Sequence, residues 1–135
     1  MPDIRVSAAV ILDDAERVLV VRKKGTTRFM QPGGKPEAGE TPAQTLIREL
    51  EEELGVRIDE SRLRPLGTFV SAAANEPGHR VIADAFATTI DPREVSVRAE
   101  LEELRWITRD EVPGLALAPL SLEHLLPLAW PMSPA

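Results

Sequence analysis

Residues 31–56 read QPGGKPEAGETPAQTLIRELEEELGV, and this stretch decides the fold. Thr41 is a typical N-cap residue, Pro42 takes the first helical position, and Gln44 completes a capping box three residues after Thr41. A glycine follows the last apolar position, which is typical of a helix end. The pattern therefore predicts a helix over residues 42–54, preceded by a loop rich in glycine and proline.

The predicted helix has an apolar face and an acidic face. Its apolar stripe, which should face the core, consists of Leu46, Ile47, Leu50 and Leu54. Glu49, Glu52 and Glu53 are spaced i, i+3 and i+4, so their carboxylates share one face beside that stripe. A solvated acidic surface is one interpretation. However, like charges at these spacings repel by about a few tenths of a kcal/mol per pair, and desolvation near the core increases that cost. A bound Mg²⁺ or Mn²⁺ would remove both penalties, so the helix is a candidate metal site.

The flanking sequence predicts strands on both sides of this helix. Predicted strands cover residues 4–12 and 17–22, which form a hairpin with a turn at Asp13-Asp14, and residues 66–73, 80–90 and 103–108, with a turn at 75–78. A second helix is expected from residue 110, at least over 120–126, with prolines that fragment it. Residues 131–135 are expected to form a disordered tail. This order predicts a mixed sheet between helices in a single domain, residues 1–135.

The central stretch also carries a family motif. Gly34 is followed after five residues by Glu40, and after seven more by residues 48–56, RELEEELGV. This segment resembles the complete Nudix box, Gx5Ex7REUxEExGU, where U is a bulky aliphatic residue, and every fixed position matches. The resemblance implies an α+β fold, a Nudix-like α/β/α sandwich with a mixed central sheet. It also implies metal-dependent hydrolysis of a diphosphate linkage in a nucleoside diphosphate derivative.

The resemblance assigns roles within the motif. The implied catalytic residues are Glu49, Glu52 and Glu53, and the implied ligands of Mg²⁺ (or Mn²⁺) are these three and the carbonyl of Gly34. Glu49 would act as a ligand or help to deprotonate water. Glu40 and Arg48 would orient the loop and the helix through ion pairs rather than touch substrate.

Many family members take one more acid from a later loop. Glu100, Glu102 and Glu103 lie shortly before Trp106, and Glu100 is favoured as the metal-facing acid because it precedes the predicted strand. A solvent-exposed acidic loop is the alternative for each of the three. Sheet alternation would place Glu102 and Glu103 on opposite faces of the strand.

Substrate contacts are expected from residues near the loop. The basic residues that could hold a phosphate are Arg22, Lys23, Lys24, Arg28 and Lys35, although ordinary solubilising charge is the alternative interpretation. Phe29 could line the pocket, and core packing is the competing role. Signatures of several Nudix subgroups are absent: Ser71 stands where the ADP-ribose subgroup has a proline, and the chain has no Tyr. Exclusion leaves nucleoside triphosphates, including oxidised nucleotides, as the expected substrates.

Two other functions compete with this one. A catalytically silent Nudix-like nucleotide-binding or regulatory module would usually lack one or more of the box acids, all of which are present here. Isomerase chemistry on an isoprenoid diphosphate is disfavoured because the chain has no Cys.

The composition of the chain limits the kinds of partner that it is expected to bind. The formal net charge of −6 opposes binding of a nucleic acid polymer, because such binding depends on neutralising phosphates with Lys and Arg. No apolar run approaches the roughly 18 residues that cross a membrane, and the first residues lack the pattern of a signal peptide. We therefore expect a cytoplasmic protein with a small-molecule partner, no nucleic acid polymer and no membrane. The sequence is compatible with a homodimer.

Overall fold

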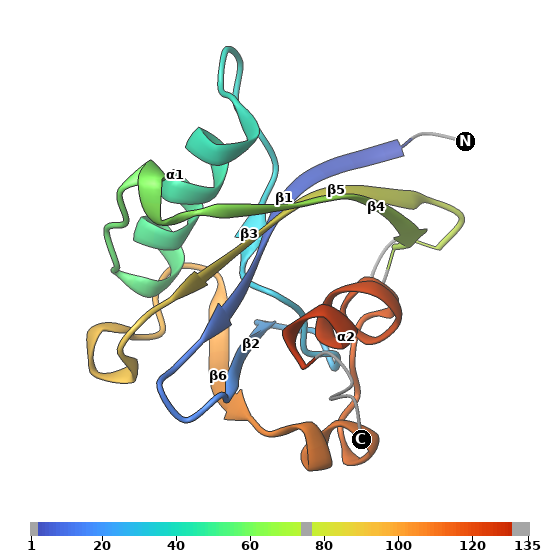
Figure 1. Ribbon diagram of the computed structural model, residues 1–135. Coiled ribbons are helices and arrows are strands. Elements are labelled where there is room, and N and C mark those ends of the chain that lie inside the picture. Colours follow the sequence, from blue (N-terminus) through green and yellow to red (C-terminus); the bar gives the residue numbers. More distant parts are fainter. Residues whose placement is uncertain (1–2, 74–76, 131–135) are drawn as a thin grey trace.

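The computed structural model describes residues 3–73 and 77–130, whose strands form a mixed sheet (Figure 1). The strands are β1 (Asp3–Leu12), β2 (Val18–Lys23), β3 (Gly33–Gly34), β4 (Arg64–Ala72), β5 (Arg80–Thr89) and β6 (Leu101–Ile107). Their order is β4-β5-β1-β2-β6, and β3 pairs with β1. β1 runs parallel to β5 along its whole length, while the other pairs are antiparallel. The predicted mixed sheet is therefore confirmed.

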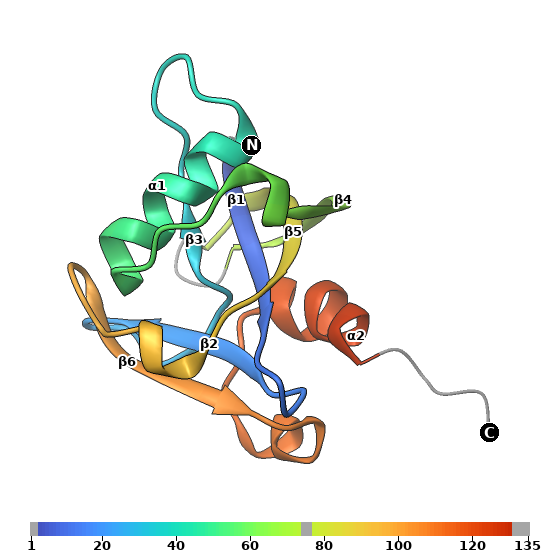
Figure 2. The ribbon, with the colours of Figure 1, turned by 60° about the vertical axis from the view of Figure 1, so that its left-hand side comes forward.

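The sheet divides between β1 and β2. These strands pair only at Leu12 and Val18, after which β2 continues along β6. Figure 2 shows β2 and β6 diverging from β1. The predicted hairpin is thus confirmed only at its turn, where the Asp13 carboxylate accepts hydrogen bonds from the backbone N–H groups of Ala15 and Arg17 at 2.9 and 2.8 Å. The main partner of β1 is β5, far along the chain, and local turn signals do not reveal such pairing.

The helix α1 spans Pro42–Leu54, as predicted. The N–H of Gln44 donates to Oγ1 of Thr41 at 3.1 Å, and the N–H of Thr41 donates to Oε1 of Gln44 at 2.9 Å, which completes the capping box. Gly55 ends the helix in the left-handed region with φ of 71°. Its apolar stripe packs on the sheet in one buried cluster that includes Leu46, Leu50, Leu54, Ala9, Ile11, Leu19 and Val21.

The opposite face of the sheet is covered by the C-terminal segment, so that the strands lie between helices (Figure 1). Alternate residues of β1 show these layers: Ala9 and Ile11 pack toward α1, whereas Ala8 and Val10 pack with Leu125. This arrangement confirms the α/β/α sandwich.

The helix expected over residues 120–126 is confirmed, but the chain before it does not form one helix from residue 110. A 3₁₀ helix over Arg109–Gly114 is followed by a bridge between Phe29 and Leu117, which takes the chain out of helical conformation. A π-helical turn (Ser121–Leu125) then leads into α2 (Leu126–Ala129). The N–H of Leu126 bonds to the carbonyl of Ser121, five residues back. The next residue is a proline, which has no N–H to donate and whose ring would clash in a regular helix, and this accounts for the wider turn.

Other boundaries differ from the prediction by small shifts. β6 begins at Leu101, two residues earlier than expected, and β3 lies inside the segment predicted as a loop. Short 3₁₀ turns occur at Glu60–Arg62 and Pro92–Glu94. The predicted tail at 131–135 and part of the turn predicted at 75–78 fall outside the described residues. Within residues 3–73 and 77–130, no helix has the length and apolar character needed to cross a membrane.

Candidate active site

Acids from two segments line one cavity of about 460 Å³. They are Glu49, Glu52 and Glu53 from α1, together with Glu100 from the turn before β6. Glu53 is buried, with only 4% of its surface exposed, whereas the side chain of Glu52 is 55% exposed. The predicted acidic face of α1 is therefore the wall of a cavity rather than an open surface.

The glycine loop packs against this wall through β3. Gly33 has φ of 151°, and a β-carbon there would clash with the backbone oxygen of Ser7 on β1. A β-carbon at Gly34 would lie 2.5–2.7 Å from the carboxylate oxygens of Glu49, so a larger residue there would displace that carboxylate. The N–H of Gly33 also reaches Oε1 of Glu53 at 3.4 Å. The loop thus places backbone groups beside the helix carboxylates.

Burial makes the charged forms of two of these acids unfavourable. Burial is the main cause that raises the pKa of Glu53 to about 7, and the negative charge of Glu49 raises it further. The pKa of Glu49 is also raised, chiefly by burial, although the hydrogen bond from Arg48 opposes this. Lys23 provides the nearby positive charge that lowers both pKa values. A divalent cation would stabilise the charged form of both groups.

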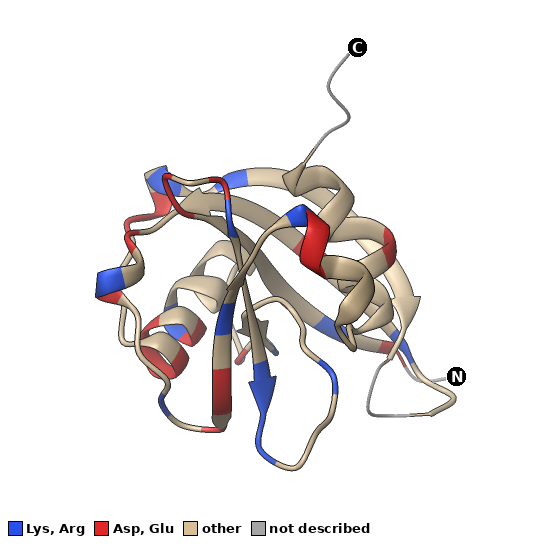
Figure 3. Cartoon of the chain, turned by 90° about the horizontal axis from the view of Figure 1, so that it is seen from below, with Lys and Arg blue, Asp and Glu red and all other residues tan. Residues whose placement is uncertain are grey.

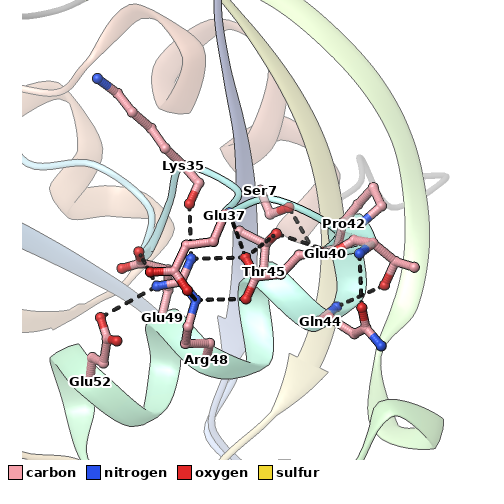
Figure 4. A network of polar contacts seen from close by, with 11 residues as sticks. Ser7, Lys35, Glu37, Glu40, Pro42, Gln44, Thr45, Arg48, Glu49 and Glu52 are labelled. Carbon is pink, nitrogen blue, oxygen red and sulfur yellow. Dashed lines mark hydrogen bonds and ion pairs between the residues drawn. The ribbon is translucent and has the colours of Figure 1, made fainter.

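Arg48 holds the loop and the helix together (Figure 4). Its guanidinium makes two hydrogen bonds to Glu40, at 2.7 and 3.0 Å, and a third to the backbone oxygen of Lys35 at 2.9 Å. It also donates to Oε1 of Glu49 at 3.0 Å and to Glu52 at 3.5 Å. The hydrogen bonds from Arg48 are the main cause that lowers the pKa of Glu40 to about 2. These contacts suit the positioning role expected for Glu40 and Arg48.

The turn that carries Glu100 is anchored to the end of α1. The N–H of Arg98 donates to the carbonyl of Glu53 at 2.9 Å, and the N–H of Ser96 donates to that of Leu54 at 3.0 Å. Carbonyls in the last turn of a helix need such partners, because they have none within the helix. Ala99, just before Glu100, has a left-handed φ of 53°. The β5–β6 connection is thereby folded back over the acidic wall.

Of the three acids before Trp106, Glu100 is the one that lines the cavity. Glu103 pairs instead with Arg22, with Nε of Arg22 3.1 Å from Oε1 of Glu103. Glu102 is exposed on β6. This placement favours Glu100 as the additional acid.

The predicted substrate-binding residues do not all lie in the cavity wall. Lys35 lines the cavity, but Arg22 is held by Glu103 and the backbone oxygen of Thr26, and Arg28 is exposed. Phe29 belongs to the apolar cluster near the C-terminal segment and is 7% exposed. The cavity wall does not include Arg22, Arg28 or Phe29. Core packing explains the burial of Phe29. Figure 3 shows Lys and Arg residues scattered among Asp and Glu residues.

Two further residues line the cavity, of which Lys23 was among the expected phosphate-binding residues and Gln31 was not expected. Lys23 lines the cavity, and its Nζ lies 3.9 Å from Oε2 of Glu100. Strand alternation was the available signal, since it places Lys23 on the face opposite to Arg22. Gln31, just before the glycines, is buried at 6% exposure and also lines the cavity. Its uncharged side chain gave no comparable signal.

The cavity fits a divalent cation by its donor chemistry. Hard cations take carboxylate and carbonyl oxygens, and the wall supplies four carboxylates beside glycine backbone. In the described part of the chain, no three acidic or histidine side chains already converge on a single point. Arg48 accounts for part of this, because it engages Glu49 and Glu52.

Known proteins resemble this chain in both sequence and structure. The NUDIX domain family model matches residues 2–130. An uncharacterized Nudix hydrolase of Pseudomonas aeruginosa is 31% identical over 127 residues, which cover 86% of this chain and 72% of that protein. An 8-oxo-dGTP diphosphatase of Haemophilus influenzae is 42% identical over 57 residues, covering 39% of this chain and 42% of that protein. The crystal structure of a MutT protein from Methanosarcina mazei has the same fold, with a TM-score of 0.76 at 20% identity, and the match covers 95% of this chain and 93% of that one.

Proposed function

The chain belongs to the Nudix family of pyrophosphohydrolases, and we propose that it cleaves a diphosphate linkage in a nucleoside triphosphate, including an oxidised one. The observation that carries this proposal is the cavity in which carboxylates from α1 and from the β5–β6 turn face the glycine loop. The similarity to an 8-oxo-dGTP diphosphatase supports a nucleotide as the substrate.

We propose Mg²⁺ or Mn²⁺ as the cofactor. The groups that would hold it are Glu49, Glu52, Glu53, Glu100 and the carbonyl of Gly34. When bound, the cation neutralises diphosphate oxygens and lowers the pKa of a water molecule.

The side chains of the cavity have separate proposed roles in binding and in proton transfer. Arg48 engages Oε1 of Glu49, so we assign Oε2 of Glu49 to accept the proton of the attacking water. Lys23 and Lys35 lie in the cavity wall, where their ammonium groups bind phosphate oxygens of the substrate. Attack at phosphorus needs positioning and charge stabilisation but no protein nucleophile, in keeping with a chain that has no Cys.

A substrate panel tests this function. The protein is incubated with nucleoside triphosphates, oxidised nucleotides and nucleoside diphosphate derivatives at millimolar Mg²⁺ or Mn²⁺. Products are then identified, and heavy-oxygen water shows which phosphorus was attacked. Matched variants are Glu52→Gln and Glu51→Gln, because Glu51 lies next in the motif but pairs with Arg57 outside the cavity. Turnover that is lost in E52Q and kept in E51Q supports the proposal. Nucleotide binding without turnover of any substrate would instead identify a silent binding module.

A further inference from the structure

Lys23 is a basic side chain within the acidic part of the cavity wall. It lies at the end of β2, and its Nζ is 3.9 Å from Oε2 of Glu100. Of the two lysines that line the cavity, Lys23 is the one that pairs with a cavity acid in the described part of the chain. Burial raises the pKa of Glu49 and of Glu53, and the positive charge of Lys23 opposes that rise for both. The ammonium charge therefore acts on acids from both segments of the wall.

The backbone of Lys23 is fixed, whereas its ammonium is accessible and weakly held. Lys23 pairs with Leu101 across β2 and β6, and the N–H of Lys24 donates to the carbonyl of Glu100 at 2.9 Å. The side chains of Lys23 and Glu100 are 37% and 77% exposed, so a ligand in the cavity can reach both. An ion pair this exposed contributes little to stability. The ammonium can therefore leave Glu100 for a stronger partner by rotation of its flexible stem.

Two kinds of ligand would affect this ammonium in opposite ways. A divalent cation held by the acids would be repelled by the ammonium, which already neutralises part of their charge. A diphosphate would attract the ammonium, because phosphate oxygens are strong acceptors for lysine. Lys23 therefore competes with the cation for the acids but favours the diphosphate.

We infer that Lys23 couples the binding of these two ligands: it opposes a divalent cation at the acidic wall until a diphosphate draws its ammonium away from Glu100. The inference rests on the proposed function, because it requires both ligands in this cavity. Such coupling is reciprocal, so the diphosphate raises the affinity for the cation by the same factor as the cation raises the affinity for the diphosphate. The free protein would then hold the cation weakly and the cation with its diphosphate tightly.

Two binding measurements on the full chain test this role. Electron paramagnetic resonance of free Mn²⁺ gives the Kd for Mn²⁺ without any phosphate ligand. Calorimetry in saturating Mn²⁺ gives the Kd for the Mn²⁺ complex of methylenediphosphonate, which resists hydrolysis. The test variant is Lys23→Met, which keeps the length of the stem but removes the charge, and Lys23→Arg keeps the charge. The matched control is Lys24→Met, which loses the same charge from an exposed neighbour outside the cavity wall.

We expect K23M to change the two dissociation constants in opposite directions. Removal of the charge beside the acids should tighten Mn²⁺ binding by roughly 10-fold, since a neighbouring charge shifts an ionisation constant by at least that order. Binding of the methylenediphosphonate complex should weaken by roughly 10-fold, as expected for the loss of one hydrogen bond from a charged group. K23R should resemble the wild type. K24M should change both constants by less than about twofold, because solvent and salt screen its exposed charge.

Other outcomes would overturn the inference. Mn²⁺ binding that is unchanged or weaker in K23M, or undetectable in both K23M and the wild type, would show that Lys23 does not oppose the cation. Unchanged binding of the methylenediphosphonate complex would show that the ammonium does not engage the diphosphate. Equal changes in K24M would assign the effect to net charge, and weaker binding of both probes with a lower Tm would assign Lys23 a structural role. Opposite shifts in a protein that hydrolyses no nucleoside triphosphate would refute the proposed function and leave the inference standing.

Discussion

Replacing Glu53 with Gln should stabilise the metal-free protein while it abolishes catalysis. The side chain is 4% exposed, and its pKa is raised to about 7 by burial and by the charge of Glu49. Because the folded-state pKa lies above the ordinary value of 4.5, the folded protein holds this proton more tightly than the unfolded chain does. Stability is therefore lost as the pH rises from about 4.5 to 7, and E53Q avoids that loss.

The pKa values set the size of the effect. A rise from 4.5 to about 7 corresponds to an upper limit of roughly 3–4 kcal/mol above pH 7, at about 1.4 kcal/mol per tenfold change in the ionisation constant. Relaxation of the site would reduce this to about 1–3 kcal/mol. A domain of this size then gains about 3–10 °C in Tm. At pH 4 the difference should almost vanish, because the carboxyl is then mostly protonated in both the folded and the unfolded states.

The assay is thermal unfolding of the wild type and E53Q in a chelator at pH 4 and pH 8, followed by turnover in Mg²⁺. The matched control is Glu52→Gln, a proposed ligand on the same helix whose side chain is 55% exposed. E52Q should lose activity without gaining stability. An E53Q variant that is less stable than the wild type at pH 8, or equally stabilised at both pH values, would refute the electrostatic reasoning.

Three further predictions concern the same cavity. Millimolar Mg²⁺ or Mn²⁺ should raise the Tm of the wild type by mass action on the folded state, and the shift should shrink in E53Q; a flat titration would count against a metal site. Glu100→Gln should lower kcat at limiting metal, whereas Glu102→Gln should be nearly silent, and the reverse order would contradict the placement of Glu100 in the cavity. Arg48→Met should lower kcat by about 10-fold or more and also lower the Tm, since it removes the hydrogen bonds that join Glu40 to the helix; unchanged kinetics would disprove the positioning role.

Local signals predicted α1 and its boundaries correctly. The Thr41 cap, the proline beside it and Gly55 act within a few residues, and α1 begins and ends in the structure where they predict. The glutamate positions follow from helical spacing. The pairing of β1 with β5 was missed because a parallel partner far along the chain leaves no turn signal, and only the Leu12–Val18 end of the predicted hairpin is paired.

The basic residues show where sequence reasoning lost precision. Arg22 and Lys23 are adjacent, and their charges alone do not distinguish them. The pairing of β2 with β6 distinguishes the two residues, because Arg22 lies opposite Glu103 and the register shifts between Arg22 and Lys23. Lys23 is thereby left in the cavity wall near Glu100. A one-residue difference in strand register thus decides which basic side chain faces the cavity.

The acidic and the apolar parts of the cavity are encoded differently in the sequence. Three acids lie on one helix, so a fixed spacing reveals them. The apolar part is assembled from β1, from β5, from the segment before the π-helical turn and from Gln31, and these segments have no common spacing. The strands and the segment before the π-helical turn contribute ordinary aliphatic residues, and an aliphatic residue looks the same in a core as in a binding site. Among the described residues, the side-chain amide of Gln31 has no hydrogen-bond partner, and this feature becomes visible only when the surrounding atoms are placed. Relatives can therefore share the helix acids and differ in substrate, because the apolar residues of the cavity are free to change without disturbing the motif.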